Sequence, residues 1–230
     1  MPALFRRRHV WVPTVWGWLA LFLACGALGV IAIRSLYGFL SPTEPVSARI
    51  LVVEGWVPVE EFDEAVTLIR QGGYERVITT GGPMLNALEV PDTRTYAERA
   101  RDHLVRRGLP ESLVTALSAP ASAQDRSFLN AVLLREWLER SGNGAHAVNV
   151  FSSGPHSRRS RLLHRMACPA CEIGIIAGTP PEYDPAAWWR TSAGARDVIG
   201  ESIGWMWARF FFRPGPPGSH EERWGIPQPG

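Results

Sequence analysis

The sequence predicts an α/β fold in which a Rossmann-like parallel sheet carries helices on both faces, preceded by an N-terminal transmembrane helix. Two patterns predict the domain. Short, continuous apolar runs alternate with amphipathic segments, and most of these runs stop at a turn rich in glycine, proline or hydroxyl residues. Strands that are apolar along their whole length are typical of a parallel sheet buried on both faces. A long uncharged segment behind a basic cluster predicts the membrane helix.

The membrane segment comes first in the chain. Residues 10–33 carry no charged side chain, and as a helix they would be about 36 Å long, enough to cross a hydrocarbon core of about 30 Å. Arg6, Arg7 and Arg8 precede the segment, and Arg34 follows it. Because basic flanks stay in the cytoplasm, we expect a single-pass protein of the inner (plasma) membrane, with a cytoplasmic N-terminus and an extracytoplasmic body. The membrane is thus a partner through residues 10–33.

Two alternatives to an uncleaved anchor are a cleaved signal peptide and a lipoprotein signal with Cys25 as the lipidated residue. A signal peptide has a shorter apolar region and a small-residue cleavage site, whereas this apolar run continues past Cys25 to Ile33. The pattern favours the anchor, so that residues 1–34 form the basic flank and the membrane span. All three interpretations place the rest of the chain outside the cytoplasm.

Composition and motifs exclude several function classes. The chain has no lysine, and its formal net charge is +2. Four arginines and no acidic residues lie in the first 34 residues, so the body that follows is slightly acidic, which argues against a nucleic-acid partner. The sequence contains no GxGxxG, Walker, HExxH or GxSxG motif and no cluster of metal ligands. We therefore expect neither a metal nor a bound cofactor.

The body begins after a linker, which residues 35–48 predict because they contain two prolines and small polar residues. The α/β domain follows over residues 49–213. Its strands are predicted at residues 49–54, 76–80, 113–117, 148–152 and 173–177. Its sheet-covering helices are predicted at residues 59–71, 93–107, 125–140 and 157–166, with a loop over residues 84–92. Right-handed crossovers bring the loops after the strands to one edge of the sheet, where ligands bind in such folds.

Local signals support these helix boundaries. The helix over residues 59–71 has Phe62, Ala65 and Ile69 on one face, and a glycine pair follows it. The helix over residues 93–107 is followed by Gly-Leu-Pro, which stops a helix for the same reason. Both helices therefore have one apolar face for the sheet and a defined end.

Cys168 and Cys171 form a CxxC pair. Reactive pairs of this kind usually lie at a helix N-terminus, where the thiolate is stabilised, but this pair follows a predicted helix and precedes a predicted strand. No second pair completes a zinc site. We expect either a disulfide within the loop or two unreactive thiols.

The C-terminal part continues beyond the fifth strand. Asp184 is placed to cap a short helix that carries Trp188 and Trp189. A longer helix over residues 192–212 ends in a very apolar segment, which either packs against the sheet, the alternative we favour, or lies on the membrane interface as an amphipathic element. Residues 214–230 are rich in proline and glycine, and we expect them to be extended or mobile.

The segment over residues 148–159 indicates an anion-binding corner. It predicts a strand, then a tight turn containing Ser153 and His156, then a helix that starts with Arg158 and Arg159 nearby. Backbone N–H groups at a helix start attract anions, and arginine adds charge and a fork of donors. An ordinary turn with solvated arginines is the alternative that this segment alone leaves open.

Several short motifs occur in an order that resembles the DUF218 family of envelope proteins, also called the ElyC/SanA/YdcF family. These motifs are VITTGG at residues 77–82, YAERA at 96–100, RGLP at 107–110, SFLN at 127–130 and HSRR at 156–159, with Trp188, Trp189 and Glu201 downstream. The resemblance extends over about residues 50–212. Each motif alone is weakly specific, whereas their order and spacing together are fairly specific.

The resemblance implies a Rossmann-like domain that acts in envelope maintenance or in peptidoglycan and lipid-carrier metabolism. One branch of the family is associated with S-adenosylmethionine, so an S-adenosylmethionine- or nucleotide-binding protein is a further alternative, which is disfavoured because either ligand is hard to supply outside the cytoplasm. The chain departs from the family at the first turn, where Glu54, Gly55 and Trp56 stand in place of a glycine-rich turn. We therefore expect ligand contacts at that turn to differ from those of the family.

The candidate site residues divide into two groups. Glu98 and His156 are the candidate acid–base residues, with Glu98 either acting as a base or orienting His156 or Arg159. The candidate ligand-binding residues are Glu54, Gly81, Gly82, Ser127, Asn130, Ser153, Arg158 and Arg159. Glycines let a ligand approach backbone amides, and arginine suits a phosphate or carboxylate.

Two functions fit these features. The first is an envelope enzyme or binding protein for an anionic metabolite, a glycan or a lipid-linked phosphate, and it predicts that Glu98, His156 and Arg159 face one pocket. The second is a non-catalytic scaffold that works through the tryptophan pair and the aromatic helix, and it predicts an exposed apolar patch without a pocket.

Overall fold

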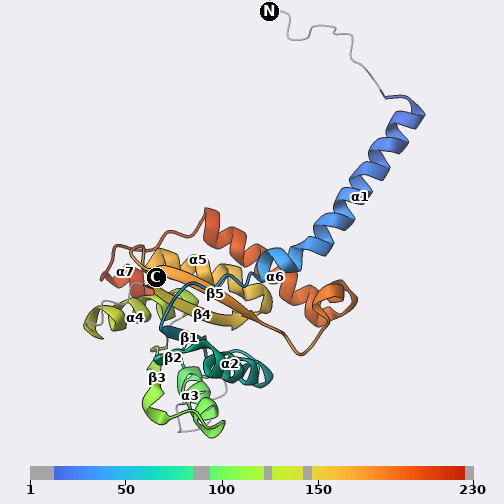
Figure 1. Cartoon of the computed structure of the whole chain (residues 1–230). Coiled ribbons are helices and arrows are strands. Elements are labelled where there is room, and N and C mark those ends of the chain that lie inside the picture. Colours follow the sequence, from blue (N-terminus) through green and yellow to red (C-terminus); the bar gives the residue numbers. More distant parts are fainter. Residues whose placement is uncertain (1–12, 85–93, 122–125, 142–146, 226–230) are drawn as a thin grey trace, which may run out of the picture. The chain divides into compact units, whose positions relative to one another are not determined.

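The computed structural model describes residues 13–84, 94–121, 126–141 and 147–225 (Figure 1). The chain divides into two compact units, Met1–Leu36 and Tyr37–Gly230. The first unit contains most of helix α1 (Val15–Leu40), whose length and apolar composition suit either a membrane anchor or a signal sequence. The basic flank and the first residues of the predicted span lie outside the described residues.

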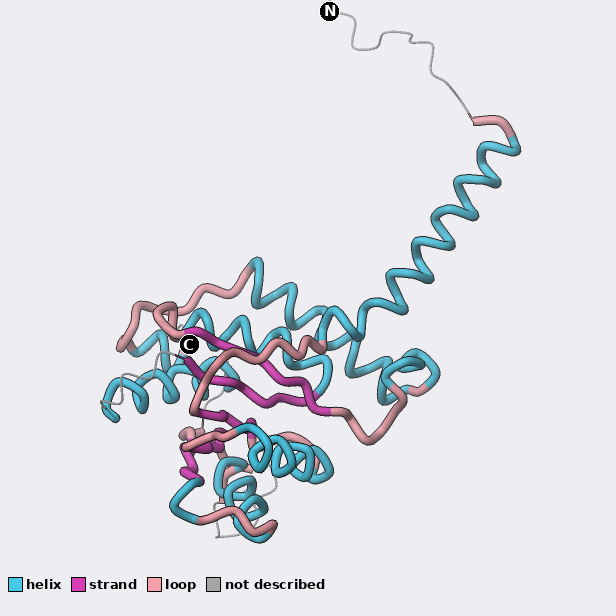
Figure 2. The backbone as a smooth tube through the Cα atoms, viewed as in Figure 1, coloured by secondary structure: helices cyan, strands magenta, loops and turns pink. Residues whose placement is uncertain are grey.

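The second unit contains a five-stranded parallel sheet, which confirms the predicted α/β class (Figure 2). Its strands are β1 (Ile50–Glu54), β2 (Arg76–Gly81), β3 (Val114–Ser118), β4 (Ala147–Ser153) and β5 (Glu172–Gly178). The strand order is β3-β2-β1-β4-β5. Strands β2 and β3 therefore lie on one side of β1, and β4 and β5 lie on the other. The strand order reverses between β1 and β4.

Helices cover both faces of the sheet. They are α2 (Val59–Gly72), α3 (Tyr96–Arg106), α4 (Arg126–Ser141) and α5 (Ser157–Ala167). Val53 of β1 belongs to one apolar core with Phe62 of α2 and Leu104 of α3. Its neighbour Val52 points to the opposite face and belongs to a second core with Leu134 of α4. Alternation along one buried strand thus divides the core into two layers.

Helix α6 (Ser192–Phe210) forms an outer layer over α4 and α5. Ala208 packs there with Phe128 of α4 and Leu163 of α5. A short 3₁₀ segment, η4 (Pro185–Arg190), precedes α6, and the Asp184 carboxylate caps it by accepting a bond from a backbone N–H. One face of α6 therefore packs against the body, but on α4 and α5 rather than on the sheet as expected, because these helices already cover that face of the sheet. Other side chains of the same helix remain exposed.

The segment predicted as a linker, residues 35–48, is ordered along the body. Helix α1 continues through its first residues to Leu40, which is fully buried. Glu44 then forms an antiparallel bridge with Ile175 of β5. Because β5 is the edge strand, its free backbone groups supply partners that the composition of the segment does not reveal.

The tail, residues 214–230, is not simply extended. It contains the short helix α7 (His220–Trp224), where the Ser219 hydroxyl accepts a bond from the Glu222 backbone N–H. The Glu222 carboxylate accepts two bonds from Arg135 of α4, at 2.5 and 2.9 Å. The expectation of an extended tail is therefore wrong for its described part, because a buried arginine on α4 holds it in place.

Cys168 and Cys171 form a disulfide in the turn between α5 and β5, which decides between the two expected alternatives. Cys25 is a free and exposed thiol. Nearly all of the loop predicted over residues 84–92 lies outside the described residues.

Candidate functional site

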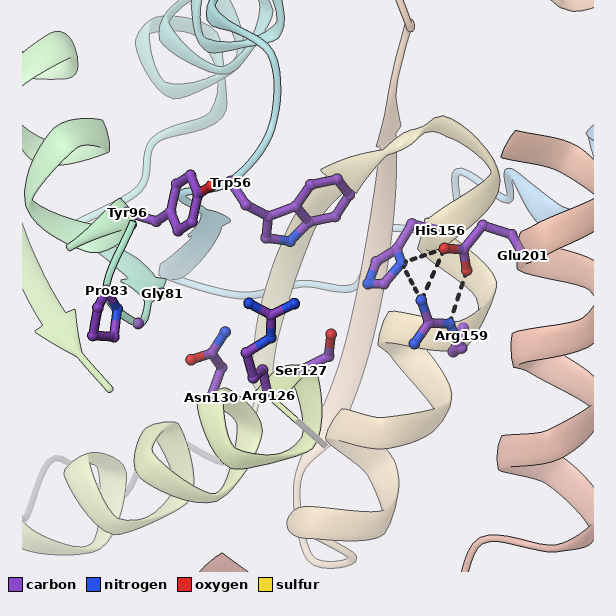
Figure 3. Close-up of a pocket in the computed structure, with 11 residues that line it drawn as sticks. Trp56, Gly81, Pro83, Tyr96, Arg126, Ser127, Asn130, His156, Arg159 and Glu201 are labelled. Atoms are coloured by element: carbon purple, nitrogen blue, oxygen red, sulfur yellow. Dashed lines mark hydrogen bonds and ion pairs between the residues drawn. The ribbon is translucent and has the colours of Figure 1, made fainter. Parts of the chain in front are cut away.

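A pocket with a volume of about 340 Å³ lies at the C-terminal edge of the sheet (Figure 3). It is lined by Trp56, Gly81, Gly82, Pro83, Tyr96, Arg126, Ser127, Asn130, His156, Arg159 and Glu201. These residues follow β1, β2 and β4 or come from α3, α4, α5 and α6. The pocket therefore lies beside the reversal of strand order, the usual ligand position in open α/β sheets, and its volume suits a small molecule.

Gly81 brings one wall of the pocket into place. Its φ angle is +152°, and a Cβ atom there would lie 2.6 Å from the Tyr96 Cβ. Only glycine fits both constraints without strain. The first turn of α3 can therefore approach the end of β2, with Tyr96 at the pocket.

The first turns of α4 supply polar groups. Arg126 is exposed and forms no ion pair with any described residue, and Ser127 and Asn130 lie beside it in the pocket wall (Figure 3). Asn130 is only 6% exposed, and its Oδ1 has no hydrogen-bond partner among the described residues. Buried polar atoms are nearly always satisfied. Among the described residues, this wall thus offers unused hydrogen-bonding capacity and a positive charge that no carboxylate compensates.

The opposite wall holds a charged cluster of His156, Arg159 and Glu201. Arg159 donates to both Glu201 oxygens, from Nε and Nη2, at 2.8 Å each. His156 Nδ1 lies 3.1 Å from Glu201 Oε1 and 2.9 Å from Arg159 Nη2. Gly204 makes room for this arrangement, because a Cβ atom there would lie 3.0 Å from Arg159 Nε.

The His156 ring can bond only one of these two neighbours through Nδ1. A guanidinium always donates, and a carboxylate always accepts. Arg159 is already paired with Glu201, so a proton on Nδ1 is donated to Glu201, while the buried Nε2 has no hydrogen-bond partner among the described residues. Glu201 therefore orients the His156 ring, in the way that carboxylates orient histidines in catalytic and metal sites.

A second carboxylate lies behind the ring. Glu54 is 1% exposed and accepts bonds from the Ser152 and Ser160 hydroxyls, at 2.5 and 2.8 Å. Its Oε2 lies 3.8 Å from His156 Nε2. The His156 ring thus lies between two carboxylates, Glu201 on its Nδ1 side and Glu54 on its Nε2 side.

The ion pair between Arg159 and Glu201 shifts the pKa values of both residues. Burial alone would raise the pKa of Glu201, but hydrogen bonds from His156 and Arg159, together with their charges, bring that pKa well below its usual range. Burial opposes the charge of Arg159 as well, and the bond to Glu201 outweighs it, so that its pKa is raised. Glu201 is therefore ionised at neutral pH and compensates the charge of Arg159.

Six of the predicted site residues meet in this pocket. They are Gly81, Gly82, Ser127, Asn130, His156 and Arg159. Each follows a strand or starts a helix at the C-terminal edge, as the loop positions predicted.

Four other predicted residues do not line the pocket. Glu98 caps α3, where its carboxylate accepts a bond from the Thr95 backbone N–H at 2.8 Å. Glu54 lies beneath His156 rather than at the pocket surface. Ser153 donates to Glu61 of α2 at 2.5 Å, and Arg158 donates to the carbonyl of Phe39.

Five lining residues were not among the predicted site residues: Trp56, Pro83, Tyr96, Arg126 and Glu201. Trp56 stacks edge-on against His156, with ring centroids 4.7 Å apart. Trp56 and Arg126 lie in loops or helix starts at the correct edge, so position alone identifies them as candidates. Glu201 lies in the middle of α6, where no local pattern distinguishes it from a solvated carboxylate, and only the family resemblance drew attention to it.

The site can bind and polarise a ligand through its own side chains. In the described part of the chain, no group of three or more His, Cys, Asp or Glu side chains is placed to hold a metal ion. Arg126, Ser127 and Asn130 offer donors and an acceptor, and His156 offers a ring that Glu201 holds in place at the pocket wall. No family model matches the chain, and no curated protein matches it significantly.

Proposed function

We propose that this chain is a membrane-anchored, extracytoplasmic DUF218-like protein of cell-envelope maintenance that binds an anionic small molecule or a lipid-linked phosphate in the pocket. The carrying observation is the pocket itself, with Arg126 uncompensated by any described residue at the sheet edge where α/β proteins bind ligands.

The balance of charge favours an anion. Glu201 compensates Arg159, so Arg126 is the excess positive charge at the pocket surface within the described part of the chain. Arginine and the exposed N–H groups of a first helical turn are the usual partners of phosphate and carboxylate. The Ser127 hydroxyl and the Asn130 amide lie beside them. The aromatic rings of Trp56 and Tyr96 provide apolar walls for the uncharged part of such a ligand.

Two features support the proposed location. Helix α1 is 26 residues long, and a helix of that length exceeds the thickness of a hydrocarbon core of about 30 Å. The Cys168–Cys171 disulfide also fits an oxidising compartment outside the cytoplasm. Both observations support a body that faces the periplasm or the outside of the cell.

A non-catalytic scaffold is the second candidate, and the exposed apolar side chains of α6 favour it. A scaffold does not require a concave site with an oriented histidine and an arginine that no described residue compensates. The pocket therefore favours ligand binding as the primary role.

The experiment is calorimetric titration of the full-length protein in nanodiscs with inorganic phosphate and with hexyl phosphate. We expect both probes to bind, and Arg126→Ala to weaken binding at least about tenfold, which is about 1.4 kcal/mol. Arg140→Ala, an exposed arginine at the other end of α4, is the matched control and should bind as wild type does. Equal affinity in wild type, Arg126→Ala and Arg159→Ala would exclude this pocket as the anion site.

A further inference from the structure

Helix α6 has an exposed apolar face on the side away from the body. It consists of Ile199, Ile203, Met206, Trp207 and Phe210, which are between 46% and 59% exposed. Their spacing of three, four or seven residues places them on one stripe of the helix. We call this stripe the α6 outer face. A contiguous apolar stripe of this kind on a water-facing helix marks an interaction surface.

The charged residues of α6 are sorted between its two sides. Both carboxylates of the helix turn to the body, since Asp197 accepts a bond from Tyr183 and Glu201 pairs with Arg159. Arg196 and Arg209 are exposed, and Arg213 follows just beyond the helix. The outer face is thus apolar, carries no carboxylate of its own helix and has arginines around it.

The chain enters the body beside this helix. Phe39, in the last turn of α1, packs edge-on against Trp205 of α6, with ring centroids 5.0 Å apart. Arg158 of α5 lies over the same Phe39 ring, 4.0 Å from its centroid. Arg34, the last charged residue before this contact, is five residues earlier, which is roughly 7.5 Å of helix.

We propose that the α6 outer face docks into the headgroup region of the membrane that holds α1. The proposal rests on the anchoring proposed above. If α1 spans the bilayer, Arg34 marks its outer boundary, and the covalent chain then holds α6 within a short distance of that surface. Tryptophan, phenylalanine and isoleucine beside arginines form the composition that lies in an anionic lipid interface.

A second cavity connects this surface with the ligand site. Its volume is about 270 Å³, and it shares Arg126, Ser127 and Arg159 with the candidate pocket. Leu163 and Trp207 also line it, and Trp207 belongs to the α6 outer face. With the α6 outer face in the membrane interface, this second cavity opens at the lipid surface. An amphiphilic anion can then reach the candidate pocket while its apolar part stays in the membrane.

The test places nitroxide labels on the full-length protein in nanodiscs of neutral and anionic phospholipid. In a Cys25→Ser background, single cysteines replace Ile203 or Phe210 on the outer face. Leu28→Cys in α1 reports the anchor, and Glu75→Cys, on an exposed side chain before β2, reports water. Accessibility of each label to oxygen and to a nickel chelate is measured by electron paramagnetic resonance.

We expect the labels at positions 203 and 210 to prefer oxygen, as the label at position 28 does, and the label at position 75 to prefer the nickel chelate. If positions 203 and 210 match position 75 while position 28 reports lipid, the docking proposal is wrong and the anchor stands. Protection from both reagents means that a protein partner or a second copy covers the face, which also overturns docking. A water signal at position 28 overturns the anchor and the docking together.

Discussion

Arg159 of α5 and Glu201 of α6 form a two-point ion pair across the boundary between two helical layers, with both N–O distances at 2.8 Å. The pair joins the outer helix to the pocket wall and holds His156 by the same carboxylate. A single side chain on α6 thus contributes to packing, to the charge of the pocket and to the orientation of its histidine.

Replacing Glu201 by glutamine keeps the size of the side chain and removes its charge. Since hydrogen bonds to charged groups contribute about 1.5–3 kcal/mol each, we expect a loss of about that size in the free energy of unfolding. Urea denaturation in detergent micelles measures it. Glu75→Gln, which breaks only an exposed pair with Arg49, should change little. Equal effects of the two substitutions would show that the Arg159–Glu201 pair is not a structural contact.

The same pair predicts an acid limb of the stability profile. The pKa of Glu201 is lower in the folded protein than its ordinary value of 4.5. Its contribution is therefore present above that value and is lost as the pH falls below it. We expect the free energy of unfolding of wild type to fall below about pH 4.5 more steeply than that of Glu201→Gln. Parallel profiles would contradict this assignment.

The buried carboxyl group of Glu61 predicts a free energy of unfolding with the opposite dependence on pH. It is fully buried, and burial raises its pKa to about 8, with Ser153 opposing the shift and nearby carboxylates adding to it. Because this pKa is raised on folding, the contribution of Glu61 to the free energy of unfolding is fully present below about pH 4.5 and is lost as the pH rises toward 8. Glu61→Gln should therefore be more stable than wild type at about pH 8. The exposed Glu60→Gln serves as control, and an equal gain there would exclude burial as the cause.

The buried contact between Arg135 and Glu222 predicts that the tail stabilises the body. Breaking one partner of a buried pair costs about 3–5 kcal/mol, because a charge remains buried without compensation. We expect Glu222→Gln to lower the free energy of unfolding by an amount of that order in urea denaturation. Glu221→Gln, on the exposed neighbour, should have almost no effect. If the tail did not contact the body, both substitutions would change the free energy of unfolding equally and only slightly.

Gly81 provides a test of how the pocket is built. Gly81→Ala adds a Cβ atom 2.6 Å from the Tyr96 Cβ at a positive φ angle, so we expect both a loss of stability of about 1–3 kcal/mol and weaker phosphate binding. Gly73→Ala is the matched control, because Gly73 also has a positive φ angle but no atom lies within 4 Å of its added Cβ. It should cost some stability and leave phosphate binding unchanged.

The positions of the strands, and the sheet edge at which the candidate site lies, were predictable from the sequence, because β-branched runs and turn residues are local signals. The same signals placed Gly81, Ser127 and His156 at the site. Arg158 and Arg159 were not distinguishable, since neighbours on a helix point about 100° apart and only packing decides which faces the pocket. Glu98 carried a readable signal, the Thr-x-x-Glu spacing of a capping box. Glu201 carried no such local signal and was singled out only by the family resemblance, because its role depends on how α6 packs against α5.

The central claim is that the pocket holds an anionic ligand, and native mass spectrometry of the full-length protein tests it most directly. The protein is purified gently from the envelope of its own host and released from nanodiscs. We predict a co-purifying mass that contains phosphate or sugar and is lost in both Arg126→Ala and Arg159→Ala, while Arg140→Ala retains it. A wild-type protein that is empty in this measurement and in the phosphate titration would contradict the claim.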